Sequence, residues 1–401
     1  MDAKRQNFSW PLLGSNFSFV FGDGLYRFAL NWFLVASYGD AKVVGWLTSF
    51  GFVVYLLNDL YVGALLDRFN RKILLLGADA FGALGLVSLA WFVNPDKPQI
   101  WLLAILTFIL NVDISFAYPA GRAIIPDVIK ANRLAQFNAW ASVAFSTGAT
   151  VAPLVGGLLL QLKWVDLRTF LIGYGIMLML TVLMNMFIKY QPEPNNQVHE
   201  NIFTSMVEGY KYVVKRPRLF ESMLITMWGN VFFESFLVAI PFLVQKVYGG
   251  SAAQYALMLT WSAMAGILAG IFLTRFPQFN NVRTLYWDFI VAGVLFIAAT
   301  FVPVLWVLFV VEIAFGYARE TFGVKIMTIR QTASEPEFIG RVFGISFMVT
   351  DLFVPFTTVI MGYVVGPLGR WILFILGAAL IIGLIIIHQI TKLRLAKFGE
   401  M

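Results

Sequence analysis

The sequence predicts an all-α membrane protein with twelve transmembrane helices in two six-helix halves. The 401 residues are 59% hydrophobic and only 13% charged, whereas soluble globular chains average about 45–50% apolar and about 25% charged residues. The apolar residues gather in blocks of about 20 residues, the length that a helix needs to cross a bilayer core. One long polar segment, residues 191–218, divides the blocks into two equal sets.

The apolar blocks are interpreted as helices because lipid offers no hydrogen-bonding partner, so the backbone must bond within its own segment. They are also too long for the strands of a membrane barrel. The first block is expected to be a retained span, because it is too long for the apolar region of a secretory signal. The predicted spans are 11–38, 44–66, 73–93, 99–120, 136–161, 167–189, 219–246, 252–274, 284–302, 304–325, 342–363 and 370–391.

The distribution of Lys and Arg places both termini in the cytoplasm of a multi-pass protein of the cell (inner) membrane. Most of the 29 Lys and Arg residues, Lys325 and Arg330 among them, fall in segments that the alternation of spans places inside. The predicted outer loops hold only Lys42, Lys97, Lys163, Arg168, Lys246 and Arg370. The net charge of +7 therefore indicates topology and not a nucleic-acid partner.

The two halves are predicted to be residues 1–190 and 219–401, joined by a cytoplasmic linker with an amphipathic helix at 191–218. Short segments recur between them: "GALLDRF" at 63–69 is similar to "GIFLTRF" at 270–276, and "FLV" occurs at 33–35 and again at 242–244. Arg122 and Arg133 likewise match Arg330 and Arg341 at a nearly constant offset. Such a parallel repeat is typical of secondary transporters, whose substrate site lies near the bilayer midplane between the repeats.

The loop "GALLDRFNRK" at 63–72 resembles the signature Gly-x-x-x-Asp-Arg-x-Gly-Arg-Lys of the major facilitator superfamily. The matching residues are Gly63, Asp67, Arg68, Arg71 and Lys72. The resemblance implies a conformational latch, in which Gly63 permits close helix approach and Asp67 pairs with a basic group or helix N-terminus of the opposite half. Asn70 replaces a glycine of the motif, which is tolerable if it adopts a left-handed conformation. A plain positive-inside loop is the competing interpretation.

A second segment, "STGATVAPLVGG" at 146–157, resembles the helix-five motif of antiporters in the same superfamily. Gly148, Pro153, Gly156 and Gly157 match the motif, and Ala152 replaces a glycine. Small residues and a proline are expected to give a bent, closely packed helix. An ordinary packing seam would show the same pattern.

Further segments resemble the drug-exporter branch that contains macrolide efflux pumps and the enterobactin exporter. They are "GDGLYRFAL" in the first span, "YPAGRAIIPDVIKANRLAQFNA" between spans four and five, "EGYKYV" at 208–213 and "PEFIGRVFGI" at 336–345. The resemblance implies secondary active export of small amphiphilic molecules, multidrug or macrolide-like, by proton antiport with alternating access. The chain is thus predicted to be a transporter and not an enzyme, and it has no Gly-x-x-x-x-Gly-Lys-Ser/Thr loop for ATP.

Three alternatives stay open at this point. One is an exporter of a siderophore, peptide or lipid on the same fold. Another is a metal exporter, because the first span also resembles the "GD…FA…FLV…YG" pattern of ferroportins; the absence of Cys and the presence of only two His residues argue against it. The third is a sensor or scaffold that transports nothing, which would leave acids inside spans as an unexplained cost. We expect no cofactor, no bound metal and a monomer in contact with membrane lipid.

Acidic residues inside spans are candidates for proton coupling, because they are costly there and a carboxyl in a low-dielectric site can exchange protons near neutral pH. The candidates are Asp23, Asp113, Glu234, Glu312 and Glu320. Arg27 follows Asp23 by one helical turn and could hold it ionised as a structural ion pair. Glu234 has no basic residue within one turn and is therefore the first choice. Asp288, near a membrane face, is expected to be structural.

The resemblance also implies which spans line the substrate cavity: one, seven and ten. Their candidate lining residues are Arg27, Trp32, Trp228, Phe232, Phe236, Tyr317 and Arg319. Aromatic walls with a few charges suit amphiphilic and cationic molecules through apolar burial and cation–π contact. Packing between helices and contact with lipid are the competing explanations for each aromatic residue.

Overall fold

The structure is a computed structural model. It describes residues 5–162, 165–190, 202–335, 338, 341–342, 345–346 and 351–398; within these ranges the side chains of residues 60, 63, 64, 67, 68, 135, 202–206 and 397–398 are not described. The described chain is helical almost throughout, with an isolated β-bridge between Gln6 and Ile129. The prediction of an all-α protein is confirmed.

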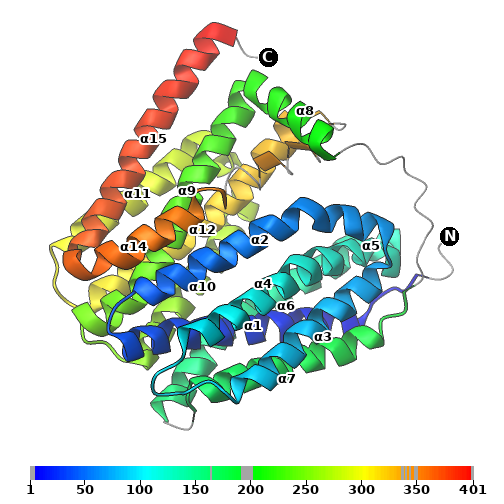
Figure 1. Cartoon of the computed structure of the whole chain (residues 1–401). Helices are drawn as coiled ribbons and strands as arrows, with labels where there is room; N and C mark the ends of the chain where they lie inside the picture. The colour runs from blue at the N-terminus through cyan, green and yellow to red at the C-terminus, as the bar shows by residue number, and fades with distance from the viewer. Residues whose placement is uncertain are drawn as a thin grey trace. The chain divides into compact units, whose positions relative to one another are not determined.

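The chain divides into two compact units, and the first consists of Met1–Gln197 with Ser251–Thr260. Within it, α1 packs against α6 and α7, α3 against α4 and α7, and α2 against α4 (Figure 1). Its helices are α1 (Trp10–Tyr38), α2 (Lys42–Arg68), α3 (Arg71–Ala90), α4 (Ile100–Ala123), α5 (Ile125–Val128), η2 (Ala131–Arg133), α6 (Leu134–Gln161) and α7 (Leu167–Met186).

The second unit consists of Val198–Gly250 and Trp261–Met401. Helix α9 is its central element, with α12, α14 and α15 packed against it, and α11 packs against α12 and α15. Its helices are α8 (Ile202–Lys215), α9 (Pro217–Phe242), η3 (Leu243–Val247), η4 (Pro277–Phe279), α11 (Val282–Thr300), α12 (Trp306–Ala333), α14 (Val354–Leu368) and α15 (Trp371–Phe398), and α10 (Ala252–Arg275) contributes its last two-thirds.

Eight helices in the described ranges are long and apolar enough to cross a membrane: Arg71–Ala90, Ile100–Val128, Gln136–Gln161, Leu167–Met186, Pro217–Val247, Ala252–Arg275, Val282–Thr300 and Trp371–Ala396. Helices α1, α2 and α12 have 29, 27 and 28 residues but are not among these eight. Helix α14 has 15 residues, and the predicted span 342–363 extends into residues that are not described. The total of twelve spans stays a prediction.

Helix α12 extends beyond the tenth predicted span, 304–325. Helix α12 continues to Ala333, so Lys325 and Arg330 lie inside the helix and are buried. The alternation of spans had placed both in a cytoplasmic segment, and that assignment stays a prediction. Their placement inside α12 is possible because each has a polar partner on a neighbouring helix, as described below.

The two similar heptapeptides of the proposed repeat, 63–69 and 270–276, form the ends of two helices. Helix α2 ends at Arg68 and α10 at Arg275, the matching arginines of the two similar heptapeptides. The next residue closes each helix in the same way, because the N–H groups of Phe69 and Phe276 donate to the carbonyl oxygens four residues earlier, each at 2.8 Å. The duplication and the predicted boundaries of the halves stay predictions.

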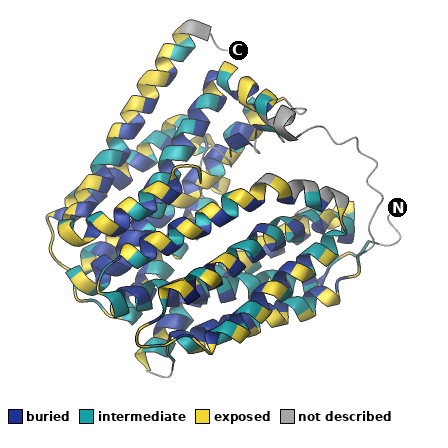
Figure 2. Cartoon of the chain, in the orientation of Figure 1, coloured by how far each residue is buried: buried dark blue, intermediate teal, exposed yellow. Residues whose placement is uncertain are grey.

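Many large hydrophobic side chains are exposed on the helices, and Figure 2 shows exposed residues along the helices of both units. On α15, for example, Ile382, Ile385 and Ile386 are each more than half exposed. A soluble protein rarely exposes large contiguous apolar patches, whereas lipid favours them. The surface therefore agrees with a multi-pass membrane protein.

Candidate functional site

Helix α1 carries the predicted ion pair between Asp23 and Arg27. Arg27 Nε donates to Asp23 Oδ2 at 2.8 Å, and the two side chains are 58% and 23% exposed for Arg27 and Asp23 respectively. The spacing of four residues places both on one face of the helix, as the sequence predicted. The carboxylate therefore sits among apolar helices with a cation beside it while part of its surface stays reachable.

Two glycines flank Asp23 and let α1 approach its neighbours. A Cβ at Gly22 would lie 2.9 Å from Met177 Cβ on α7, and one at Gly24 would lie 2.8 Å from Ala152 Cβ on α6. Any side chain at either position would push the helices apart. The glycines thus hold α1 between α6 and α7, with Asp23 at the junction.

In the second unit, Glu234 of α9 lies near Arg319 of α12. Arg319 Nη2 is 3.6 Å from Glu234 Oε1, and the side chains are 50% and 19% exposed, in that order. Glu234 had been preferred as a proton carrier because no basic residue is close in sequence. That argument fails in three dimensions, because α12 supplies the cation across the helix contact.

Glu234 is the last of three polar residues spaced by four on α9, which we call the α9 polar face: Thr226, Asn230 and Glu234. Arg330 Nη2 donates to Thr226 Oγ1 at 2.8 Å, and Asn230 Nδ2 donates to Asp351 Oδ1 at 2.8 Å. Each position therefore has a charged partner from another segment of the second unit. The α9 polar face therefore connects this helix with charged residues of other segments of the second unit.

The two other acidic candidates of α12 have different surroundings. Glu312 is buried, and neither of its carboxylate oxygens has a hydrogen-bond partner in the described part of the chain. Ser262 of α10 is a polar neighbour of this carboxyl group. Glu320 is exposed, beside Gly270 of α10. Only Glu312 is withdrawn from solvent.

Asp113 of α4 is completely buried, and so is Asp79 of α3, which the sequence analysis did not select. Asn185 Nδ2 of α7 donates to Asp79 Oδ2 at 2.7 Å. The sequence could have identified Asp79, because it lies inside the predicted span 73–93. Acidic residues inside spans were selected as candidates for proton coupling, and this criterion applies to Asp79 as well.

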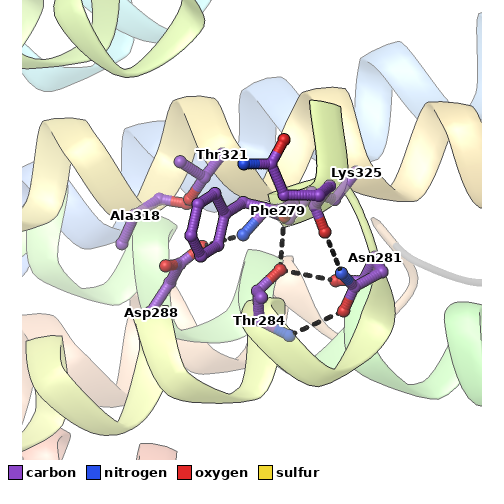
Figure 3. Close-up of polar contacts among 8 residues, drawn as sticks. Phe279, Asn281, Thr284, Asp288, Ala318, Thr321 and Lys325 are labelled. Atoms are coloured by element: carbon purple, nitrogen blue, oxygen red, sulfur yellow. Dashed lines mark hydrogen bonds and ion pairs between the residues drawn. The ribbon is translucent and has the colours of Figure 1, made fainter. Parts of the chain in front are cut away.

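The sequence analysis also missed a buried ion pair between α12 and α11. Lys325 Nζ lies 2.6 Å from Asp288 Oδ2, and the two side chains are 1% and 12% exposed. Figure 3 shows Lys325 directed at Asp288, close to the start of α11, where Thr284 N donates to Asn281 Oδ1 at 3.0 Å. The pair joins two helices of the second unit, which agrees with a structural role for Asp288.

The aromatic candidates are mostly packed against protein. Phe232 and Phe236 are buried, and both rings contact Phe296 and Phe315, at centroid distances between 4.9 and 6.5 Å. In this structure both residues pack in the core of the second unit, and their expected role as cavity lining stays a prediction. Their neighbours come from α11 and α12, which sequence proximity could not reveal.

The other aromatic candidates are less deeply buried. Trp228 Nε1 donates to the carbonyl oxygen of Ala379 on α15 at 3.2 Å. Trp32 stacks on Tyr255 at 5.9 Å, and Tyr317 is partly exposed on α12. With Arg27 and Arg319 they stay candidates for substrate contact.

The described part of the signature loop makes its contacts inside the first unit. Arg71 Nη1 lies 2.9 Å from Asp127 Oδ2, and Lys72 Nζ donates to the carbonyl oxygens of Met186 and Ile188 at the end of α7. Asn70 is the N-cap of α3, with φ of −63° and its side chain accepting from two backbone N–H groups. Capping, and not a left-handed conformation, explains why Asn replaces glycine here. The latch also requires Gly63, Asp67 and Arg68, which are among the residues whose side chains the structure does not describe.

The helix-five motif lies on α6 at its contact with α1. A Cβ at Gly148 would be 3.2 Å from Phe21 N, and one at Gly156 would be 2.7 Å from the Phe28 ring. A Cβ at Gly157 would be 2.3 Å from Ala256 Cβ, and Pro153 lies inside the helix. The packing seam is therefore present, and the antiporter role that the motif implies stays a prediction.

Gly148→Leu is expected to lower the stability of the purified protein by about 1–3 kcal/mol, the usual cost of overpacking. The reason is that the backbone of α1 cannot move aside as a flexible side chain would. Gly173→Leu on α7 is the matched control, because a Cβ there meets no atom within 4 Å. Thermal unfolding in detergent measures both, and equal midpoints for the two variants would contradict the prediction.

Comparison with known proteins now identifies the family. The sequence profile of the Major Facilitator Superfamily matches residues 12–356. The chain belongs to the major facilitator superfamily. It is therefore a membrane transporter of small molecules, and the prediction that it is not an enzyme is confirmed.

Relatives and a solved structure agree with this family. The chain is 22% identical over 380 residues to "Macrolide efflux protein A" of Streptococcus pyogenes, covering 92% of this chain and 93% of that protein. It is 23% identical over 346 residues to "Multidrug resistance protein 1" of Bacillus subtilis, covering 84% and 81%. The "Staphyloferrin A transporter" of Staphylococcus aureus is 22% identical over 280 residues, covering 68% of each chain. The structure of a bacterial homologue of the human lysosomal transporter Spinster has the same fold, with a TM-score of 0.65, 14% identity and coverage of 97% and 95%.

Proposed function

We propose that this major facilitator exports small amphiphilic molecules, macrolide-like or multidrug, in exchange for protons by alternating access. The observation that carries the proposal is a partly exposed acid–arginine pair in each unit, Asp23–Arg27 and Glu234–Arg319. The relatives named for macrolide efflux and multidrug resistance support the class of substrate.

The chemistry of these pairs suits coupling. A carboxylate holds its arginine only while it is ionised, so binding a proton and keeping the ion pair exclude each other. A cationic substrate that reaches the carboxylate competes with the arginine in the same way. Proton and substrate would therefore alternate at the same acid, which is what antiport requires.

Reconstituted vesicles test the proposal. An imposed pH gradient is expected to drive accumulation of a macrolide antibiotic or a lipophilic cationic dye, and adding either compound is expected to change the internal pH of the vesicles. Empty vesicles provide the control. If a gradient moves neither compound and neither compound moves protons, proton-coupled drug export is wrong. Quenching of an internal dye by divalent metal without a gradient would favour the ferroportin-like alternative.

Asp23→Asn is expected to reduce gradient-driven transport roughly tenfold or more, equivalent to about 1.4 kcal/mol or more in the barrier. The amide keeps the size of the carboxyl but cannot exchange a proton or hold Arg27 by charge. The double variant Asp23→Asn/Arg27→Gln removes both charges and separates the two possible roles. If the double variant recovers full transport, Asp23 serves as the partner of Arg27 and not in coupling.

Export of a siderophore is the second candidate function. It is favoured by the similarity to the staphyloferrin A transporter and by two half-exposed guanidinium groups, Arg27 and Arg319, which could bind anionic groups of a substrate. Direct binding to the purified protein tests it with an anionic siderophore and a macrolide side by side. Siderophore binding that is lost in Arg27→Gln and Arg319→Gln, without macrolide binding, would replace the first candidate.

A further inference from the structure

A pair of buried carboxyls lies where α3, α4 and α7 meet in the first unit. Asp79 and Asp113 are both 0% exposed. Gly82, one turn after Asp79 on α3, leaves the space that Asp113 occupies: a Cβ at Gly82 would lie 2.7 Å from Asp113 Oδ2. The carboxyl of Asp113 is therefore pressed against the surface of α3 one turn from Asp79, and the two groups interact electrostatically.

This cluster has many more acceptors than donors. Asn185 Nδ2 satisfies Asp79 Oδ2 at 2.7 Å. Asp79 Oδ1, both carboxylate oxygens of Asp113 and Asn185 Oδ1 are buried and have no hydrogen-bond partner in the described part of the chain. Buried polar atoms normally have partners, because leaving them unpaired costs free energy. Four such oxygens on three adjoining residues need an explanation.

No cation among the described side chains neutralises the two acids. Arg122 lines a cavity together with Asp79 and Asn185, but its guanidinium donates to the Tyr118 hydroxyl at 3.3 Å. The other charged and titratable neighbours of Asp113 are Asp23 of α1 and Tyr174 of α7, and neither brings a positive charge. Helix α6 contributes only Ala141 and Phe145 to the cavity.

A cavity borders the cluster on the side of Asp79 and Asn185. Asp79, Thr181 and Asn185 form part of its wall, and Ser15 and Asn16 of α1 form another part. Asp79 and Asn185 therefore border a cavity with polar walls, although both carboxyls of the cluster are fully buried in this structure.

We infer that Asp79, Asp113 and Asn185 form a binding site for one small monovalent cation, either a proton or an alkali metal ion, inside the first unit. Two adjacent carboxyls in a low-dielectric environment cannot both remain ionised without a positive charge beside them. A cation supplies that charge and a partner for the free oxygens, and oxygen ligands suit hard cations. The site uses no residue of the Asp23–Arg27 or Glu234–Arg319 pairs.

Infrared difference spectroscopy and calorimetry on the purified full-length protein in detergent test this site without any transport substrate. If a proton occupies it, raising the pH is expected to remove a carboxylic-acid carbonyl band that Asp79→Asn and Asp113→Asn diminish. If an alkali ion binds, NaCl is expected to release heat that choline chloride does not, and both variants are expected to lose that heat. Asp96→Asn, an exposed acid in the loop between the same helices, is the control.

Gly82→Leu provides a second variant that keeps both carboxyls. Its side chain is expected to displace Asp113 and to abolish the cation signal, whereas Gly77→Leu on the same helix meets no atom within 4 Å and is expected to retain it. The inference is overturned if the double variant Asp79→Asn/Asp113→Asn remains folded and shows the same carbonyl band and the same sodium heat as the wild type. Because no exported compound enters these measurements, their failure is distinguishable from failure of the proposed export.

Discussion

Glu234→Gln is expected to abolish transport driven by a pH gradient while leaving substrate exchange intact. Glutamine keeps the length and shape of the side chain but can neither take up nor release a proton. Glu234 is 19% exposed beside Arg319, so its carboxylate is reachable from solvent. Protonation of this carboxylate would break its ion pair with Arg319. We therefore expect the coupling to disappear and the route for the substrate to remain.

Two vesicle assays separate these effects for Glu234→Gln. Net uptake under an imposed gradient should fall to the level of empty vesicles, and exchange of labelled for unlabelled substrate at equal pH should persist. Glu320→Gln changes an exposed acid on α12 next to Arg319, and we expect it to keep gradient-driven transport. Full gradient-driven transport in Glu234→Gln would remove Glu234 as an obligatory proton carrier. The same loss in Glu320→Gln alone would transfer the role to that residue.

The contacts that the sequence predicted correctly are local ones. Asp23 and Arg27 are four residues apart on one helix, so helical geometry alone brings them within bonding distance. The glycines beside Asp23 could be recognised in the same way as positions of close helix approach. Length and apolar composition were enough to predict the helical class, because lipid leaves the backbone few alternatives.

The contacts that the sequence could not predict join helices far apart in the chain. Glu234 seemed to lack a cation because Arg319 belongs to a different helix, and the ring packing of Phe236 could not be predicted because its partners lie on α11 and α12. Charge was used as the sign of a loop after residue 325, whereas helix α12 continues through Arg330 to Ala333. That sign fails wherever a buried basic residue has a buried partner.

Lys325 is the clearest case of such a residue, and Lys325→Met is expected to destabilise the protein by about 3–5 kcal/mol. Lys325 and Asp288 are 1% and 12% exposed and 2.6 Å apart, so methionine would fill the space of the lysine but leave Asp288 with a buried, uncompensated charge. The free energy of unfolding in detergent, from denaturant titration followed by tryptophan fluorescence, measures the loss.

The size of the Lys325→Met effect distinguishes the cost of an unpaired charge from the value of the pair itself. Removing both charges in Lys325→Met/Asp288→Asn is expected to recover most of the stability, because a buried pair replaced as a whole costs little. Lys42→Met is the matched control for an exposed pair: Lys42 lies 3.2 Å from Asp40 with about half of its side chain exposed, and we expect a change of about 1 kcal/mol or less. If Lys325→Met lowered the free energy of unfolding no more than Lys42→Met does, water would have to reach Asp288. The contact between α11 and α12 would then be more open than it is in this structure.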